Sequence, residues 1–331
     1  MKRKIIITAI ILLILIIISA GTVFVIKNFD LNPDKYIARV VQNAKIIDAN
    51  IDHNQALDVI EYAQKQGIKP PSILINFDTH SDIYVNRRIS KEKGAQIEDW
   101  INEYIAKNNN VDTVYWVMPK EEALDFLLRY DFGEHDGIDI AWGIPVFGNV
   151  FKPDMVRFLF LPLTVKPYTQ KFLINPKNAL MNEYVEGYEY NNLLFEDKTK
   201  FKEVTLITCT EETLPDFKGK DVFLSIDADY MSNSGFDTGE DFEIKKTPQE
   251  LEKTFLSIMK TIDKKNIRPQ VISLTLSPEY LPSKHHAHVI DLFERILIIA
   301  GLPDALLTYT RFNVHEEDED YNGGKSFRHK N

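Results

Sequence analysis

Two clusters of acidic and imidazole side chains each follow directly on an apolar stretch of this sequence. The first cluster consists of Asp78, His80 and Asp82, and the second consists of Asp227 and Asp229. Alternate side chains of an extended chain point to the same side, so the members of each cluster can share one face. Carboxylates and imidazoles at this spacing can hold a divalent cation or move protons to and from a substrate.

A divalent metal is the simplest reason for bringing these groups together. Four carboxylates beside an imidazole repel one another, and burying them unpaired is costly. Oxygen ligands with some imidazole suit Mn²⁺ better than Zn²⁺. The ligands exceed what one ion in an open catalytic site takes, so we expect two ions that share bridging carboxylates. Each cluster alone could equally consist of turn residues or helix caps, but their joint occurrence favours metal.

Apolar stretches alternate with amphipathic ones and indicate the elements that must position the clusters. Buried strands are predicted over residues 72–77, 113–117, 157–161, 204–209, 222–226 and 271–276. Helices are predicted over residues 54–66, 97–106, 248–262 and 289–300. This alternation predicts an α/β fold whose mostly parallel sheet has helices on both faces. Ligand sites of such sheets collect at the carboxyl ends of the strands, where both clusters stand.

The two clusters carry a resemblance to a known group of enzymes. The segment from Asp78 to Asp82 resembles the Asp-Ala-His-x-Asp motif of the arginase and agmatinase ureohydrolases, and Ser225 to Asp229 resembles their Ser-x-Asp-x-Asp motif. Over about residues 45–310, the chain is similar to a little-characterised branch of that fold, the peptide-arginase-like family. The other matching segments are Asp52 to Leu57, Trp116 to Pro119, Ser277 with Pro278, and Pro282. The resemblance implies an arginase-like domain.

The resemblance also implies which residues bind metal. One Mn²⁺ would be held by His53, Asp78, Asp82 and Asp227, and the other by Asp78, His80, Asp227 and Asp229. Asp78 and Asp227 would then bridge the two ions. Asp82 and Glu279 would be the catalytic residues. Glu279 precedes Pro282 by three residues, which is the spacing of the glutamate that holds the guanidinium group in arginases.

The sequence departs from the ureohydrolase pattern in two places. Residues 230–233 replace the Leu-Asp-Pro that normally follows the second motif, and no histidine closely follows Asp82 to shuttle protons. His135 could donate protons instead, although a loop residue is the plainer interpretation. The group His285, His286 and His288 could also do so, although a partly exposed helix end is the plainer interpretation.

Three functions are compatible with these residues. The leading hypothesis is Mn²⁺-dependent hydrolysis of a C–N bond in a guanidino group, either of a small molecule or of an arginine in a peptide. A single-metal deacetylase is the second, because that class shares the arginase-like fold. The third is a non-catalytic module that binds metal or a partner through an inactive site.

The N-terminus has the features of a membrane-inserted segment. Three cations at positions 2–4 precede residues 5–26, which contain no charged residue. At about 1.5 Å per residue, this run can cross a hydrocarbon core of about 30 Å. A signal peptide cleaved near residues 19–21 is the alternative. The positive-inside rule keeps the N-terminus in the cytoplasm. We therefore expect an anchor over 1–29 and an extracytoplasmic catalytic domain over 30–331.

Composition agrees with a globular domain of this kind. The chain has 331 residues, of which 44% are hydrophobic, and a net charge of -10. An acidic chain is a poor match for nucleic acid, so no nucleic-acid partner is expected. The single cysteine, Cys209, lies in an apolar run. It can form no intramolecular disulfide, and we expect a buried strand thiol.

Overall fold

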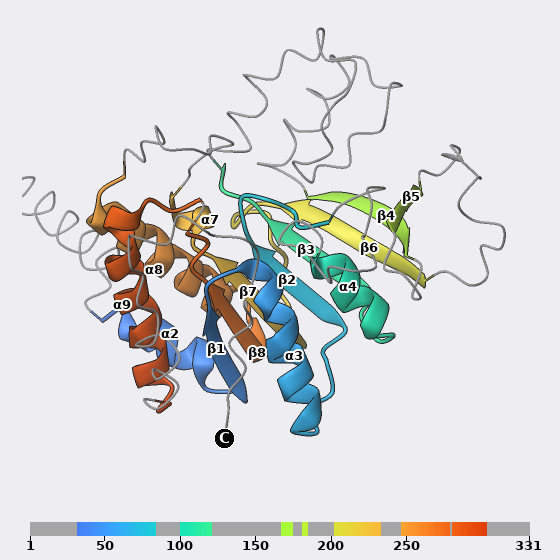
Figure 1. Cartoon of the computed structure of the whole chain (residues 1–331), viewed down its shortest axis with the longest axis horizontal. Coiled ribbons are helices and arrows are strands. Elements are labelled where there is room, and N and C mark those ends of the chain that lie inside the picture. Colours follow the sequence, from blue (N-terminus) through green and yellow to red (C-terminus); the bar gives the residue numbers. More distant parts are fainter. Residues whose placement is uncertain are drawn as a thin grey trace, which may run out of the picture.

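An eight-stranded sheet forms the centre of the protein. The computed structural model describes residues 32–83, 100–120, 167–174, 181–184, 202–232, 246–278 and 280–302. The strand order is β1-β8-β7-β2-β3-β6-β4-β5 (Figure 1). The strands from β1 to β6 in that order run parallel, whereas β4 and β5 add an antiparallel edge. The fold is therefore α/β with a mostly parallel sheet, as the sequence predicts.

The parallel strands are short and mostly buried. They are β1 (Ile46–Asn50), β2 (Ile73–Phe77), β3 (Thr113–Val117), β6 (Lys202–Cys209), β7 (Asp221–Asp227) and β8 (Arg268–Thr275). The antiparallel pair consists of β4 (Tyr168–Ile174) and β5 (Met181–Tyr184). Strand β2 lies in the middle and is buried at every position. A strand covered on both sides requires such a continuous apolar run, because neither of its faces meets water.

Helices cover the two faces of the sheet (Figure 1). One face packs against α2 (Asp34–Val41), α8 (Pro248–Lys264) and α9 (Ser283–Ile299), and the other packs against α3 (Ala56–Lys65) and α4 (Trp100–Lys107). The side chains of β2 alternate between these two cores, with Ile75 on the α8 side and Leu74 on the α3 side. The predicted three-layer arrangement is thus present.

Local sequence signals explain where the crossover helix α8 begins. Thr247 accepts a hydrogen bond from the main-chain N of Glu250, and the Glu250 carboxylate accepts one from the main-chain N of Thr247. Pro248 occupies the first helical position, where no N–H is needed. Such caps stabilise a helix by about 0.5–2 kcal/mol. Helix α8 then returns the chain from β7 to β8, which keeps the two strands parallel neighbours.

Most predicted elements are confirmed. The strands predicted at 72–77, 113–117, 204–209, 222–226 and 271–276 correspond to β2, β3, β6, β7 and β8. The helices predicted at 54–66, 97–106 and 248–262 correspond to α3, α4 and α8, with the residues before Trp100 outside the described part. The helix predicted at 289–300 begins earlier, at Ser283, because Pro282 sits at its N-cap. No prediction covered β1, α2, α7 or the antiparallel strands β4 and β5.

Two predictions fall on residues that the structure does not describe. The strand predicted over 157–161 and the membrane segment predicted over 5–26 both lie outside the described ranges. Among the residues that are described, none of the helices combines the length and the apolar character needed to cross a bilayer.

Candidate metal centre

The candidate site lies where the carboxyl ends of two neighbouring strands meet. Strands β2 and β7 pair in parallel with Phe77 opposite Ile226. Asp78 follows Phe77 and Asp227 follows Ile226, so the register of the sheet itself brings these two carboxylates to the same edge. Strand β8 aligns Thr275 with Asp227, so the segment after β8 reaches this edge as well.

His53 enters the site from the segment that follows β1. Gln55 Oε1 accepts a hydrogen bond from the main-chain N of Asp52, which shapes the turn into the short helix η1 (His53–Gln55). His53 Nε2 lies 2.7 Å from Ser225 Oγ. That contact turns the other ring nitrogen, Nδ1, toward the carboxylates. The side chain is 1% exposed, so its surroundings are set by the protein rather than by water.

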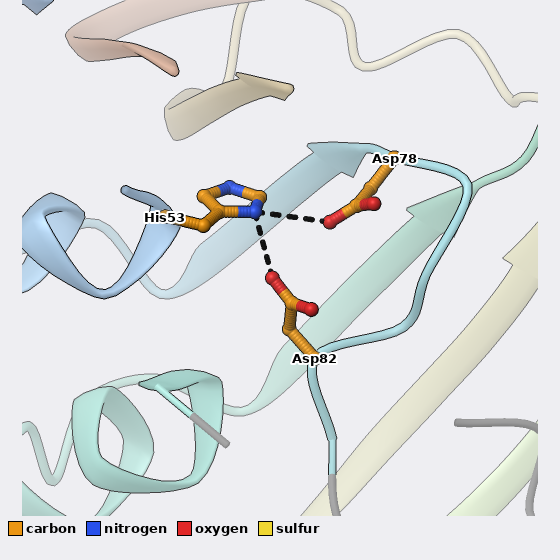
Figure 2. Close-up of side chains that lie close together, drawn as sticks. All are labelled: His53, Asp78 and Asp82. Carbon is orange, nitrogen blue, oxygen red and sulfur yellow. Dashed lines mark ion pairs between the residues drawn. The ribbon is translucent and has the colours of Figure 1, made fainter. Parts of the chain in front are cut away.

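Three carboxylate oxygens surround His53 Nδ1. The distances are 2.7 Å to Asp82 Oδ2, 3.0 Å to Asp227 Oδ2 and 3.1 Å to Asp78 Oδ2. Figure 2 shows Asp78 and Asp82 converging on this nitrogen from the loop after β2. Nδ1 is buried and forms no well-directed hydrogen bond with any of them. An imidazole nitrogen and several anionic oxygens that meet in this way form a donor set suited to a divalent cation.

A second group of ligands shares Asp78 with the first. His80 Nδ1 lies 2.7 Å from Asp229 Oδ2 and 3.8 Å from Asp78 Oδ1. Suitable ligand atoms of Asp78, His80 and Asp229 lie within 4.8 Å of one another, and so do those of His53, Asp78 and Asp82. Asp78 therefore directs Oδ2 toward one histidine and Oδ1 toward the other. That is the arrangement a carboxylate needs to bridge two cations.

The side chains of each cluster converge through turns and not through extended chain. Strand β2 ends just before Asp78, and the main-chain N of His80 donates to Asp78 Oδ1 at 2.7 Å. Asp82 has a φ of 50°, in the left-handed region. Asp229 begins the short helix α7 (Asp229–Ser232), and its main-chain N donates to Asp227 Oδ1. The prediction that each cluster shares one face of an extended segment was therefore wrong, although the expected juxtaposition occurs.

Buried side chains donate hydrogen bonds to the carboxylates that surround His53. Each Oδ2 atom that faces His53 accepts a hydrogen bond from another side chain. Asn76 Nδ2 donates to Asp78 at 2.9 Å, and Trp100 Nε1 donates to Asp82 at 2.6 Å. Ser277 Oγ donates to Asp227 at 2.5 Å. Ser277 has a φ of 46°, so the backbone is strained at this donor too. Donors of this kind orient ligands.

The two histidines of the site hold protons more tightly than free imidazole does. Burial opposes protonation of His53, but the charges of Asp82 and Asp227 outweigh it, and its pKa lies well above the usual value. Burial also opposes protonation of His80, but the hydrogen bond to Asp229 raises its pKa to about 9. Without a metal, both imidazoles would therefore be cationic at neutral pH.

Two cationic imidazoles cannot balance the charge of the four buried aspartates that face them if all four are ionised. Within the described part of the chain, the ion pairs of these aspartates involve histidine alone. The repulsion between the carboxyl groups is reflected in their pKa values. Burial raises the pKa of Asp78 to about 7. Burial, together with the charge of Asp227, holds the pKa of Asp229 well above its usual range. Asp227 remains the exception, because His53 and Ser277 overcome burial and lower its pKa. Divalent cations would remove this imbalance, so the residues present fit a metal.

The structure brings together all of the predicted metal ligands. They are His53, Asp78, His80, Asp82, Asp227 and Asp229. Glu279 and His135, the other candidates for a role in chemistry, lie outside the described residues. His285, His286 and His288 lie in the first turns of α9, as predicted, but His285 and His286 are buried and only His288 is partly exposed. Cys209 is a buried strand thiol, as predicted.

The residues that donate hydrogen bonds to the ligands were not predicted from the sequence. Asn76 interrupts the apolar run of β2, and a polar residue inside a buried strand is a usable signal. Trp100 carried no signal, because nothing in its local sequence distinguishes it from an ordinary core tryptophan. Trp116 also lies near the site, where its Nε1 donates to the main-chain O of Asp78.

Comparisons with known proteins place the chain in no established group. No protein-family model matches it, and no curated protein is significantly similar to it.

Proposed function

We propose that this site binds two divalent metal ions, most suitably Mn²⁺, and that the protein is a metal-dependent hydrolase. The observation that carries the proposal is the convergence of three carboxylate oxygens within 3.1 Å of the buried His53 Nδ1, with Asp78 shared by a second group of ligands. His53, Asp78, Asp82 and Asp227 would hold one ion, and Asp78, His80, Asp227 and Asp229 the other.

Some residues of the site would bind the ions, and others would orient those ligands through hydrogen bonds. Bound divalent ions would supply Lewis acidity, which polarises a substrate and makes water nucleophilic near neutral pH. Ser225 would keep the His53 ring in the orientation that presents Nδ1 as a ligand. Asn76 and Ser277 would hold Asp78 and Asp227 in place. Since the four aspartates and His53 are buried and His80 is only 13% exposed, little water would compete for these positions.

The reaction we propose is hydrolysis of a C–N bond, most suitably of a guanidino group on a small molecule or on a peptide arginine. The similarity of the two aspartate motifs to those of arginases and agmatinases supports this class, and a mostly parallel sheet with the candidate ligands at its carboxyl edge is compatible with it. A single-metal deacetylase is the alternative, and the two groups of ligands sharing Asp78 favour the two-ion enzyme over it.

Metal content and product release test this function together. The full-length protein, purified and loaded with Mn²⁺, should contain close to two ions per chain and release urea from arginine, agmatine or an arginine peptide. Asp227→Asn should abolish activity. One ion per chain with acetate released from an acetylated amine would favour the deacetylase. Metal binding without turnover of either kind of substrate would support a non-catalytic module.

Glu279 is the residue we propose for contact with a cationic substrate. A carboxylate makes paired, charge-assisted hydrogen bonds to a guanidinium group that an amide cannot reproduce. Glu279→Gln should therefore weaken turnover of guanidino substrates and leave metal content unchanged. Unaltered kinetics on every guanidino compound accepted by the wild type would exclude Glu279 from the site.

We also propose that residues 5–26 anchor the protein in the cell membrane, with the domain outside the cytoplasm. The uncharged run and the three cations before it support this topology. A reporter enzyme that matures only outside the cytoplasm, fused after the last residue, should be active. Activity of a cytoplasmic reporter at the same position, with none from the first, would reverse the orientation.

A further inference from the structure

Trp100 contacts two members of the first group of ligands. It begins α4 and is fully buried. Its Nε1 donates to Asp82 Oδ2 at 2.6 Å, and its ring centroid lies 4.9 Å from that of His53. The acceptor atom, Asp82 Oδ2, is the same oxygen that lies 2.7 Å from His53 Nδ1. One indole thus touches both an acidic and an imidazole ligand.

The position of Trp100 is set by the core and not by the site. Its ring packs against Tyr104 and meets Phe223 edge-on, with centroid distances of 6.4 Å and 6.1 Å. Asp82, by contrast, lies in a turn and has a backbone in the left-handed region. An indole N–H can only donate a hydrogen bond, so this contact fixes the position of the Asp82 oxygen that faces His53. A rigid donor therefore holds a ligand whose own backbone is strained.

We propose that Trp100 is a positioning residue that sets the metal affinity of the group His53, Asp78 and Asp82. The role rests on the proposed metal centre, because without a metal the hydrogen bond would only stabilise the fold. Loss of a hydrogen bond behind a ligand typically weakens metal binding by about 10–100-fold. Among the ligands in the described residues, Trp100 bonds to Asp82 and its ring lies beside His53. Both residues belong only to the first group of ligands, so the effect should fall on one ion.

Trp116 provides a matched control. It is 1% exposed, and its Nε1 donates to the main-chain O of Asp78 at 3.0 Å. Trp100→Phe and Trp116→Phe therefore each remove one buried indole N–H and keep an aromatic ring in the core. Only Trp100→Phe removes a donor from a carboxylate oxygen of a ligand.

Binding of Mn²⁺ to the full-length protein, followed by titration calorimetry and by intrinsic fluorescence, tests the role. We expect Trp100→Phe to bind one of two ions about 10–100-fold more weakly, while Trp116→Phe stays within a few-fold of wild type. Mn²⁺ should change the fluorescence of the wild type and of Trp116→Phe. That change should be largely lost in Trp100→Phe, because the indole beside His53 is gone.

Several results would overturn the role. A folded Trp100→Phe protein with wild-type affinity would do so, and so would equal weakening in Trp116→Phe, which would indicate a general effect on the core. If Trp100→Phe fails to fold, the role can be tested by NMR on wild-type protein with ¹⁵N-labelled tryptophan. Addition of Zn²⁺ should shift the indole resonance of Trp100 more than those of the other tryptophans, and an unmoved Trp100 resonance would refute the role. Wild type that binds no metal would overturn the proposed function as well, whereas wild-type binding with an unaffected variant would remove Trp100 alone.

Discussion

Replacing Asp78 by asparagine should remove both metal ions, because this residue belongs to both groups of ligands. Its Oδ2 lies 3.1 Å from His53 Nδ1, and its Oδ1 lies 3.8 Å from His80 Nδ1. Losing a donor behind a ligand already costs about 10–100-fold in affinity, so losing a bridging ligand should cost at least about 100-fold at each site.

The magnitude follows from binding linkage. At free metal of about 100 times the dissociation constant, one site stabilises the folded protein by about 2.7 kcal/mol, and a 100-fold weaker site leaves about 0.4 kcal/mol. The loss is about 2.3 kcal/mol per site. At roughly 2 °C per kcal/mol for a domain of this size, the metal-dependent rise in melting temperature should shrink by about 5 °C per site. For Asp78→Asn the total is about 10 °C.

The assay is thermal unfolding with and without Mn²⁺, together with elemental analysis. Asp221→Asn is the matched control, because it removes the same charge from an exposed position at the other end of β7. The control should keep the full metal-dependent shift. Without metal, Asp78→Asn should be at least as stable as wild type, since it removes one of four mutually repelling buried carboxylates. An Asp78→Asn protein that retains two ions and the full shift would refute the bridging role.

Two further predictions follow from the same geometry. Asp82→Asn and Asp229→Asn should each retain about one ion, because each residue belongs to only one group of ligands. By the same linkage, each variant should lose about 5 °C of the metal-dependent rise in melting temperature. Elemental analysis showing two ions in either variant would contradict this prediction. Metal affinity should also fall as pH is lowered from about 9 to about 6. Below its pKa of about 9, His80 carries a proton that a ligating imidazole must lose, and Asp78, with a pKa of about 7, does the same at lower pH. Calorimetry in buffers of different ionisation enthalpy should show proton release on binding, and an affinity independent of pH would show that the ligands bind metal without losing protons.

The fold was largely readable from the sequence because its strands are buried. The run before Asp78 and the run before Asp227 are apolar at nearly every position, which a central parallel strand requires. The strand β1 was missed because Asp48 and Asn50 break its apolar pattern, and the Asn50 side chain donates a hydrogen bond to Ser273 across the sheet. A partner from a distant segment is not visible in local sequence.

The sequence by itself determined the composition of the candidate site and its place at the carboxyl edge of a parallel sheet. The types and spacing of Asp78, His80 and Asp82 predicted a metal site, because burying such groups together unpaired is costly. What only the tertiary structure decided is which atoms face one another. The turn at Asp82 and the helix starting at Asp229 replace the extended alternation that spacing suggested. Trp100 joins the site because α4 packs beside His53, and packing between segments far apart in the chain depends on the whole core.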